Sequence, residues 1–402
     1  MLQCAPTQCT GDGRMELIQK TSHVLAPPSV GMHEYPVHFT ASGSEYFRIW
    51  IVNLLLIVVT LGIYLPWAKV RKLKYFYSNT VVDGHALDFH GKASQMLLGL
   101  FVVWICLAAY SIATDLSGVA GMAAALVFVA VWPNLFRSAM RFRLANTSWR
   151  GLRMRFTGDL AGARKAIAPP LALGLLPFAL LGIFIDKKGG GSIVAQGLVA
   201  TLAFGMLLAL VVALPYFLWR VRSYQHGNYG WGPLRTQFRS GAKPFYTVML
   251  KTSGVALLGL ICFGVAGFVW RRESGFGLAA LLGFIPLMLA FLFFVNVVPR
   301  AYLMSQMQNL VWSRTGNSQF RFRSELAFGP YALLQFRNYV LILLTLGLFW
   351  PFAVVANRRA QLEAVTLYSY IDLKSLDAVA AEGADGAAGD AAADMFGLDI
   401  GM

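Results

Sequence analysis

Charged residues are scarce in this chain, and acidic residues are the scarcest. Only 13% of the 402 residues are charged, and 19 Asp and Glu stand against 34 Lys and Arg, which gives a net charge of +15. Hydrophobic residues make up 57%, a share too high for a soluble globule. This composition excludes an ordinary soluble domain and indicates a membrane protein.

Residues that usually carry chemistry are also few. There are four cysteines and six histidines, and Cys4 and Cys9 lie outside any disulfide or metal-ligand spacing. The start of the chain has no basic segment followed by an apolar one, so we expect no cleaved signal. No phosphate loop, His-Glu-x-x-His or Gly-x-Ser-x-Gly motif is present. We therefore expect no enzyme activity, no metal and no cofactor.

Eight long apolar segments dominate what is present. About 20 apolar residues cross a bilayer as a helix, and lipid requires every backbone group to be paired. The sequence predicts an all-α polytopic membrane protein with six to eight membrane helices in a membrane domain at 45–365. A polar, weakly ordered leader at 1–44 and an acidic, Ala/Gly/Asp-rich disordered tail at 372–402 flank it. The apolar segments lie near 49–68, 93–114, 116–136, 166–185, 193–219, 252–270, 276–299 and 338–357.

The basic residues predict the orientation. Four loops, 69–92, 137–165, 220–251 and 300–337, carry 24 Lys and Arg but only four Asp and Glu. Lipid-flanking Lys and Arg explain the high pI better than nucleic acid does, so no nucleic-acid partner is expected. Cytoplasmic loops hold the excess of Lys and Arg in membrane proteins, which places these four loops in the cytoplasm.

One signature occurs twice, near the two ends of the membrane domain. Each copy reads Asn-x6-Thr-Leu-Gly, with a Pro four residues after the Gly, and this pattern indicates an internal duplication. The matched polar residues are candidates for a polar path or for helix packing, since an Asn in lipid requires a partner. They are Asn53, Thr60, Gly62 and Pro66 in the first copy and Asn338, Thr345, Gly347 and Pro351 in the second.

Basic residues flank both sides of each copy, which argues against a simple span. We predict a re-entrant element: a helix over 49–60, a break at the Leu-Gly-Ile-Tyr turn, and a return that begins at Pro66. Irregular backbone at that depth needs protein or a water-lined cavity around it. The alternative is a kinked span.

A weaker repeat runs through the basic loops. A Pro precedes each loop, and a Phe follows 23 residues later, at Phe89, Phe156, Phe238 and Phe322. An Asn stands 13 residues after the first three prolines, whereas the fourth has Trp312. Asp83-Gly84 is typical of a two-residue hairpin turn. We therefore expect internal repeats with short cytoplasmic β-hairpin-like basic loops.

The helix ends near these loops mix basic and aromatic residues, a combination that suits the lipid headgroup layer. His85 and His90 are the only metal-capable cluster, but a polar turn explains them better. Asn53 and Asn338 are explained better by helix packing than by a polar path. The candidate contacts to anionic headgroups are Lys69, Arg71, Lys72, Lys74, Arg141, Arg143, Arg153 and Arg155.

Several segments resemble the opening of the YjgN-like family of bacterial inner-membrane proteins. They are Glu45-Tyr-Phe-Arg-Ile-Trp-Ile-Val-Asn, Thr60-Leu-Gly-Ile-Tyr, Trp67-Ala-Lys-Val-Arg and Tyr75-Phe-Tyr-Ser-Asn-Thr. The similarity runs from about Phe39 to Val365, although the second copy reads Val354-Val-Ala-Asn where the first has Lys-Val-Arg-Lys. The resemblance implies a multi-pass protein of the bacterial inner membrane without established ligand residues.

Three functions stay open. One is a transporter or channel for a neutral or amphipathic solute, because duplicated broken helices are common in transporters. Another is a non-catalytic scaffold or lipid-interacting protein. An intramembrane enzyme is the third and the least supported. No ionisable residue lies deep inside an apolar segment, which disfavours proton coupling. The solute is unknown, membrane lipids are expected partners, and a homo-oligomer is left open.

Overall fold

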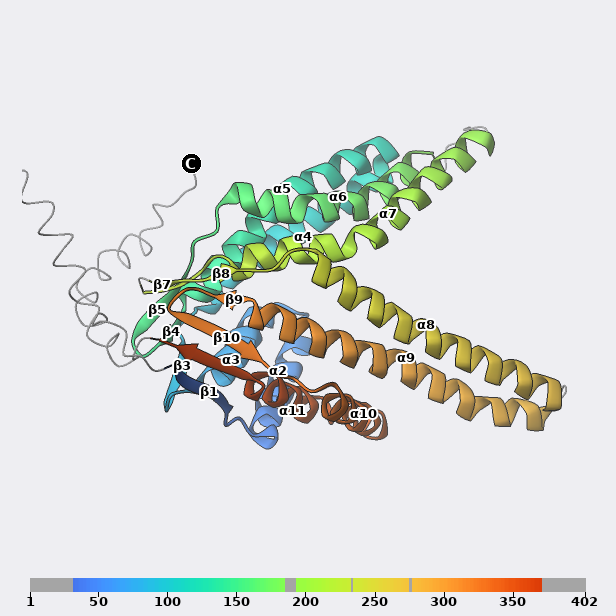
Figure 1. Cartoon of the computed structure of the whole chain (residues 1–402). Helices are drawn as coiled ribbons and strands as arrows, with labels where there is room; N and C mark the ends of the chain where they lie inside the picture. The colour runs from blue at the N-terminus through green and yellow to red at the C-terminus, as the bar shows by residue number, and fades with distance from the viewer. Residues whose placement is uncertain (1–31, 185–192, 233, 275–276, 371–402) are drawn as a thin grey trace, which may run out of the picture. The chain divides into compact units, whose positions relative to one another are not determined.

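The computed structural model describes residues 32–184, 193–232, 234–274 and 277–370 (Figure 1). Tyr35–Leu367 form one compact unit, and the other comprises Met1–Glu34 with Tyr368–Met402. Most of the predicted leader, and the whole of the predicted acidic tail at 372–402, lie outside the described residues. The end of the predicted leader forms a strand and the start of a helix.

In the described part of the chain, ten helices follow one another in pairs. Each helix contacts the next along the chain, and the last contacts the first, so the helices form a closed cycle in sequence order. The pairs are α2 (Gly43–Val59) with α3 (Leu65–Ser78), α4 (Ala93–Leu116) with α5 (Gly118–Ala145), α6 (Leu160–Phe184) with α7 (Ile193–His226), α8 (Lys243–Ser274) with α9 (Leu278–Ser313), and α10 (Phe328–Leu344) with α11 (Trp350–Glu363).

Within the described residues, five helices are long and apolar enough to cross a membrane. They are α4, α5, α8, and the Gly197–His226 and Leu282–Ser313 parts of α7 and α9. The fold is therefore that of a mostly helical polytopic membrane protein. Helix α6 borders residues 185–192, which are not described, and the predicted count of six to eight spans stays a prediction.

The predicted all-α protein with short hairpin-like loops needs one correction, because the strands of the described residues join into one sheet. Its order is β7-β6-β5-β4-β3-β2-β1-β11-β10-β9-β8. The strands are β1 (His33–Phe39), β2 (Thr80–Val82), β3 (His85–Phe89), β4 (Thr147–Trp149), β5 (Leu152–Phe156), β6 (Tyr229–Trp231), β7 (Leu234–Arg235), β8 (Gln237–Phe238), β9 (Thr315–Gly316), β10 (Phe320–Ser324) and β11 (Val365–Ser369).

The predicted hairpin turn at Asp83-Gly84 is confirmed. Both residues have positive φ, 49° and 72°, and Val82 pairs with His85 across the turn. Arg150-Gly151 makes the same kind of turn in the second loop, with φ of 52° and 79°. Two successive positive φ values are the geometry that suits a two-residue hairpin, because its twist matches that of the strands.

The two ends of the sheet meet in a single stretch of chain. Strands β7 and β8 are separated only by Thr236, and β7 pairs with β6 while β8 pairs with β9. The Thr236 hydroxyl donates to the carbonyl of His226 at 2.7 Å and accepts from the backbone N–H of Tyr229 at 3.1 Å. The sheet therefore closes on itself through this strand, which removes the open edges that would otherwise invite pairing with other chains.

Five backbone hydrogen bonds recur at equivalent places around this sheet. In each, the residue that follows one hairpin donates its N–H to the carbonyl of the residue at the start of the next. The bonds are Thr40 to Asn79 (3.0 Å), His90 to Asn146 (2.8 Å), Thr157 to Asn228 (3.0 Å), Arg239 to Arg314 (2.9 Å) and Glu325 to Ala364 (2.9 Å). These bonds join residues 39 to 75 positions apart in sequence and hold the hairpins in one cyclic arrangement.

The recurring Asn residues end their helices in the same way. The side-chain amides of Asn79, Asn146 and Asn228 donate to the carbonyl four residues earlier, at 2.7–2.8 Å, and so satisfy a carbonyl at the helix end. The predicted match of Phe322 to the other Phe residues is wrong. The bond from Glu325 assigns the equivalent position to Ser324, because α9 continues two residues further past its proline.

The buried face of the sheet packs on the helix ends. Phe39 stacks on Phe76 at 5.8 Å, Phe89 on Tyr77 at 5.6 Å, and Phe156 meets Tyr224 edge-on at 5.4 Å. All three phenylalanines are buried, and rings of this size dominate core energetics. Since successive residues of a strand face opposite sides, their neighbours in sequence lie on the other, exposed face.

Candidate functional site

The two copies of the terminal signature have the same geometry. Helix α2 ends at Val59, a turn follows, and α3 begins with Pro66 in its first turn, as predicted. Leu61 and Gly62 have φ of 50° and 91°, and their counterparts Leu346 and Gly347 have 49° and 93°. Glycine suits such a positive φ because it has no Cβ to clash. The chain therefore leaves the sheet and returns to it in both copies.

The two threonines of the signature stabilise these turns. Thr60 donates its hydroxyl to the carbonyl of Leu56 at 2.7 Å and accepts from the N–H of Tyr64 at 3.1 Å. Thr345 makes the equivalent bonds, at 2.7 Å to Leu341 and 2.9 Å from Phe349. The hydroxyl protons are used within the turn, so these side chains have a local structural role.

The tips of these two hairpins are apolar and exposed. Leu61 is 88% exposed and Leu346 is 95% exposed. Exposed leucines at both matched tips suit a hydrocarbon environment better than water, because apolar surface in water is costly.

The matched asparagines are both buried, at 7% exposure for Asn53 and 2% for Asn338. Asn338 donates its amide to the Oδ1 of Asn357 at 3.0 Å. The Oδ1 atoms of Asn53 and Asn338 have no hydrogen-bond partner in the described part of the chain. No hydrogen bond joins the two asparagines there, so each sits in its own surroundings.

A contact between the two copies was not predicted. Helix α2 packs on α11, and the rings of Phe47 and Phe352 lie 5.7 Å apart. A Cβ on Gly43 would lie 2.5 Å from the ring of Phe352, so any other residue there would require that ring to move. Arg359 donates to the carbonyl of Ala41 at 2.8 Å. This interface closes the cycle of helices, and no local pattern in the sequence indicates it.

Basic side chains of different helices meet at the helix ends. Burial lowers the pKa of Lys69, and the nearby Arg143 lowers it further. Burial likewise lowers the pKa of Lys72, with a contribution from Arg358 of α11. All six predicted headgroup contacts at the helix ends keep exposed surface: Lys69, Arg71, Lys72, Lys74, Arg141 and Arg143. The predicted headgroup contacts on α3 and α5 therefore belong to a basic region at the helix ends that also includes Arg358 of α11.

Arg153 and Arg155 lie elsewhere, on the exposed face of the sheet. Arg155 is in register with Gly230, which is in register with Arg235. Gly316 similarly pairs with both Gln237 and Arg321. Residues directly opposite one another in an antiparallel pair share a face. The glycines therefore leave room between long side chains of neighbouring strands.

We call this exposed surface of strands β5 to β10 the arginine face. Its strands contain no Asp or Glu. Arg155 donates to the carbonyl of Gly232 at 3.0 Å, and Arg323 pairs with Glu325. The other three make no ion pair with any described residue. The arginine face consists of Arg153, Arg155, Arg235, Arg321 and Arg323, all exposed.

Arg235, Arg321 and Arg323 were missed by sequence reasoning. They come from loops about 80 residues apart, and only the sheet register brings them beside Arg153 and Arg155. The alternation of Arg with apolar residues in Leu152–Phe156 and Phe320–Ser324 was a usable signal, since it is typical of a strand with one charged face. Guanidinium groups in such an array recognise phosphate oxygens in a bidentate manner.

Two histidines, His90 and His226, have structural partners. His90 shares a hydrogen bond of 2.8 Å with the hydroxyl of Ser148 in the neighbouring hairpin. His226 is buried and shares a hydrogen bond of 3.1 Å with the hydroxyl of Thr315 through its Nδ1. Among the described residues, no three His, Cys, Asp or Glu side chains lie close enough together to hold a metal ion.

Comparison with known proteins gives a family match over most of the chain. The model of a family described as "Bacterial protein of unknown function (DUF898)" matches residues 34–395. The inner membrane protein YjgN of Salmonella typhimurium is 28% identical over 44% of this chain and 45% of its own. YjgN of Escherichia coli K12 is 25% identical over 62% of each. The matched stretches thus span about half of these relatives, and no solved structure matches.

Proposed function

The chain belongs to this bacterial family of unknown function, a multi-pass family of the inner membrane, and we propose that it is a non-catalytic protein whose basic cytoplasmic side binds anionic lipid headgroups. Its lipid-binding surface comprises the basic helix ends and the arginine face. The relatives' names record the membrane and no activity.

The arginine face is the observation that carries this proposal. Five guanidinium groups lie on β5, β7 and β10, and none of the strands from β5 to β10 contains a carboxylate. Anionic lipids give the cytoplasmic leaflet a negative surface potential, which attracts Lys and Arg with about 1 kcal/mol each. The loops that carry the sheet hold 24 of the basic residues against four acidic ones. The positive-inside rule then orients the sheet toward the cytoplasm.

In this proposal the pairs α2–α3 and α10–α11 enter the bilayer from the cytoplasmic side and return to it. Helix α2 has 17 residues and is therefore about 25 Å long, which is short of a full crossing. Two features support re-entry. The hairpin tips at Leu61 and Leu346 are exposed and apolar, and both helical hairpins begin and end at the same sheet. The internally satisfied turns remove the cost of irregular backbone at that depth.

We further propose that the chain is built from five versions of one unit. Each unit is a helix that ends at the sheet, a hairpin, and a helix that leaves again. Strands β11 and β1 supply the fifth hairpin from the two ends of the chain. The five equivalent closing bonds support this interpretation.

Transport of a neutral or amphipathic solute is the second candidate, and one observation favours it. The Oδ1 atoms of Asn53 and Asn338 are buried at matched positions without a partner, and a buried orphan oxygen is costly. Asn53→Leu with Asn338→Leu tests this candidate. Lost solute flux with normal abundance would support transport, whereas lost abundance would assign the asparagines to helix packing.

Lipid binding is tested with the purified full chain in neutral detergent. Fluorescent phosphatidylglycerol and phosphatidylcholine are titrated, and the affinity is followed with salt. Replacing Arg153, Arg155, Arg235 and Arg321 by Gln should weaken binding of the anionic lipid and flatten its salt dependence. Arg272→Gln, at the opposite end of α8, is the matched control. Equal affinity for the two lipids, unaffected by salt or by the four substitutions, would overturn the proposal.

A further inference from the structure

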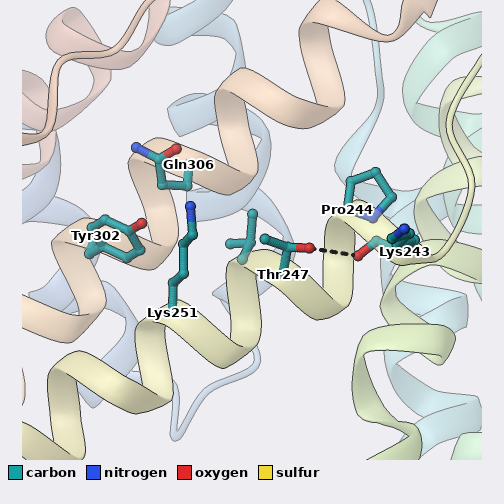
Figure 2. A pocket seen from close by; sticks show the side chains of 7 residues that line it. Lys243, Pro244, Thr247, Lys251, Tyr302 and Gln306 are labelled. Carbon is teal, nitrogen blue, oxygen red and sulfur yellow. Dashed lines mark hydrogen bonds between the residues drawn. The ribbon is translucent and has the colours of Figure 1, made fainter.

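Helices α8 and α9 line an open surface pocket beside the start of α8, in which exposed lysines stand next to apolar side chains. The pocket has a volume of about 370 Å³, and Figure 2 shows the side chains that line it. Lys243, Thr247 and Lys251 come from α8, and Tyr302 and Gln306 come from α9. The two helices run side by side along their length (Figure 1).

The lining is rich in donors and lacks carboxylates. Lys251 extends toward Tyr302 and Gln306 (Figure 2). The Thr247 hydroxyl donates to the carbonyl of Lys243 at 3.1 Å, which occupies its proton. Among the described residues, no side-chain hydrogen bond or ion pair engages the amines of the two lysines, the Tyr302 hydroxyl or the Gln306 amide. Two cations with two neutral donors match the oxygens of a phosphate group.

The position of the pocket relative to the apolar segments of α8 and α9 indicates the source of that phosphate. Lys251 stands immediately before the apolar segment of α8 that begins at residue 252, and Arg300 follows the one of α9 that ends at 299. The pocket thus lies where the apolar parts of two membrane-capable helices end. A lipid phosphate occupies this level, with its acyl chains beside the helices.

The charge of the lining indicates the class of lipid. A zwitterionic headgroup would bring an ammonium group into the pocket, and no residue that lines it carries a negative charge. The loop from 220 to 251 holds six Lys and Arg and no Asp or Glu. An anionic headgroup such as phosphatidylglycerol fits this charge, because it leaves no cation to accommodate.

We propose that this pocket is a specific site for the phosphate of one anionic phospholipid of the cytoplasmic leaflet. The proposal rests on the cytoplasmic orientation of the proposed function and deepens it, because it names one discrete site beside the diffuse basic surface. The phosphodiester sits between Lys251, Tyr302 and Gln306, and Lys243 adds a second positive charge at the start of α8. A free phosphate ion shares this chemistry, so the test separates the two sources.

The experiment is native mass spectrometry of the delipidated full chain. Short-chain phosphatidylglycerol and short-chain phosphatidylcholine are titrated separately, and inorganic phosphate is titrated both alone and in competition with bound phosphatidylglycerol. The wild type should retain one phosphatidylglycerol at concentrations that leave phosphatidylcholine unbound. Lys251→Gln should weaken this first binding step by about tenfold or more, since bonds to charged groups are worth that much. Tyr302→Phe should weaken it less.

Lys165→Gln on α6 is the matched control and should bind as the wild type does. Inorganic phosphate that competes fully with the lipid would overturn the assignment to a phospholipid. The pocket would be excluded as the lipid site if the affinity of the first binding step were unchanged both in Lys251→Gln and in the double variant Lys243→Gln with Lys251→Gln. If the arginine-face variant still loses salt-dependent binding in that case, the proposed function survives the failure of the site.

Discussion

The imidazole of His226 and the hydroxyl of Thr315 share a buried hydrogen bond of 3.1 Å between the end of α7 and strand β9. The Thr315 hydroxyl donates its proton to the carbonyl of Val311 at 2.7 Å, so His226 is the donor, with its proton on Nδ1. The carbonyl of His226 accepts from Thr236 at the point where the sheet closes. The end of α7, strand β9 and the link between β7 and β8 therefore meet at His226, where the sheet closes.

Thr315→Val should destabilise the protein, because it leaves the buried Nδ1–H of His226 without an acceptor. The expected loss in free energy of unfolding is ~1–3 kcal/mol, measured as a lower melting temperature in detergent. Thr315→Ser keeps the hydroxyl and serves as the control. A Thr315→Val protein as stable as Thr315→Ser would show that this bond contributes nothing to closing the sheet.

Gly62→Ala and Gly347→Ala should each cost ~1–2 kcal/mol, because an L residue at positive φ brings its Cβ against a carbonyl oxygen. Gly99→Ala is the matched control. Gly99 lies within α4 with no atom near its Cβ position, so alanine should be neutral or stabilising there. Equal thermal stability of all three variants would contradict the tight turns at the hairpin tips.

Gly43→Ala should loosen the contact between α2 and α11, because its Cβ would collide with the ring of Phe352. Overpacking of this kind costs ~1–3 kcal/mol. Gly329→Ala, near the start of α10, has open space around it and should leave the melting temperature unchanged. Adding Phe352→Leu should restore part of the stability of Gly43→Ala. A failure of that rescue would mean that the collision is not the cause.

Much of the local structure could be predicted from the sequence. The pattern around Gly62 and Pro66 predicted a helix, a break and a second helix, because each residue restricts its own backbone. Asp83-Gly84 predicted its turn for the same reason. Long uncharged segments predicted the membrane helices, because exposing so much apolar surface to water is unfavourable and backbone groups in lipid must be paired.

The closed sheet and the arginine face could not be predicted in the same way. Arg235 and Arg321 share a face of the sheet with Arg155 only through pairing between loops that are far apart in sequence. The position equivalent to the other phenylalanines is Ser324 and not Phe322, because α9 is two residues longer after its proline. A search for one fixed spacing from the proline cannot detect that difference. The contact of Gly43 with Phe352 joins residues more than 300 positions apart, and nothing in either local segment indicates it.

The most direct measurement is cysteine accessibility in a background that lacks the four native cysteines. We expect a membrane-impermeant thiol reagent to label Asp88→Cys and Ser318→Cys, on the sheet, only from the cytoplasmic side. Asp115→Cys, at the far end of α4, should react only from the outside, and Leu61→Cys and Leu346→Cys from neither side. Labelling of Asp88→Cys or Ser318→Cys from outside would contradict the cytoplasmic sheet on which lipid binding depends.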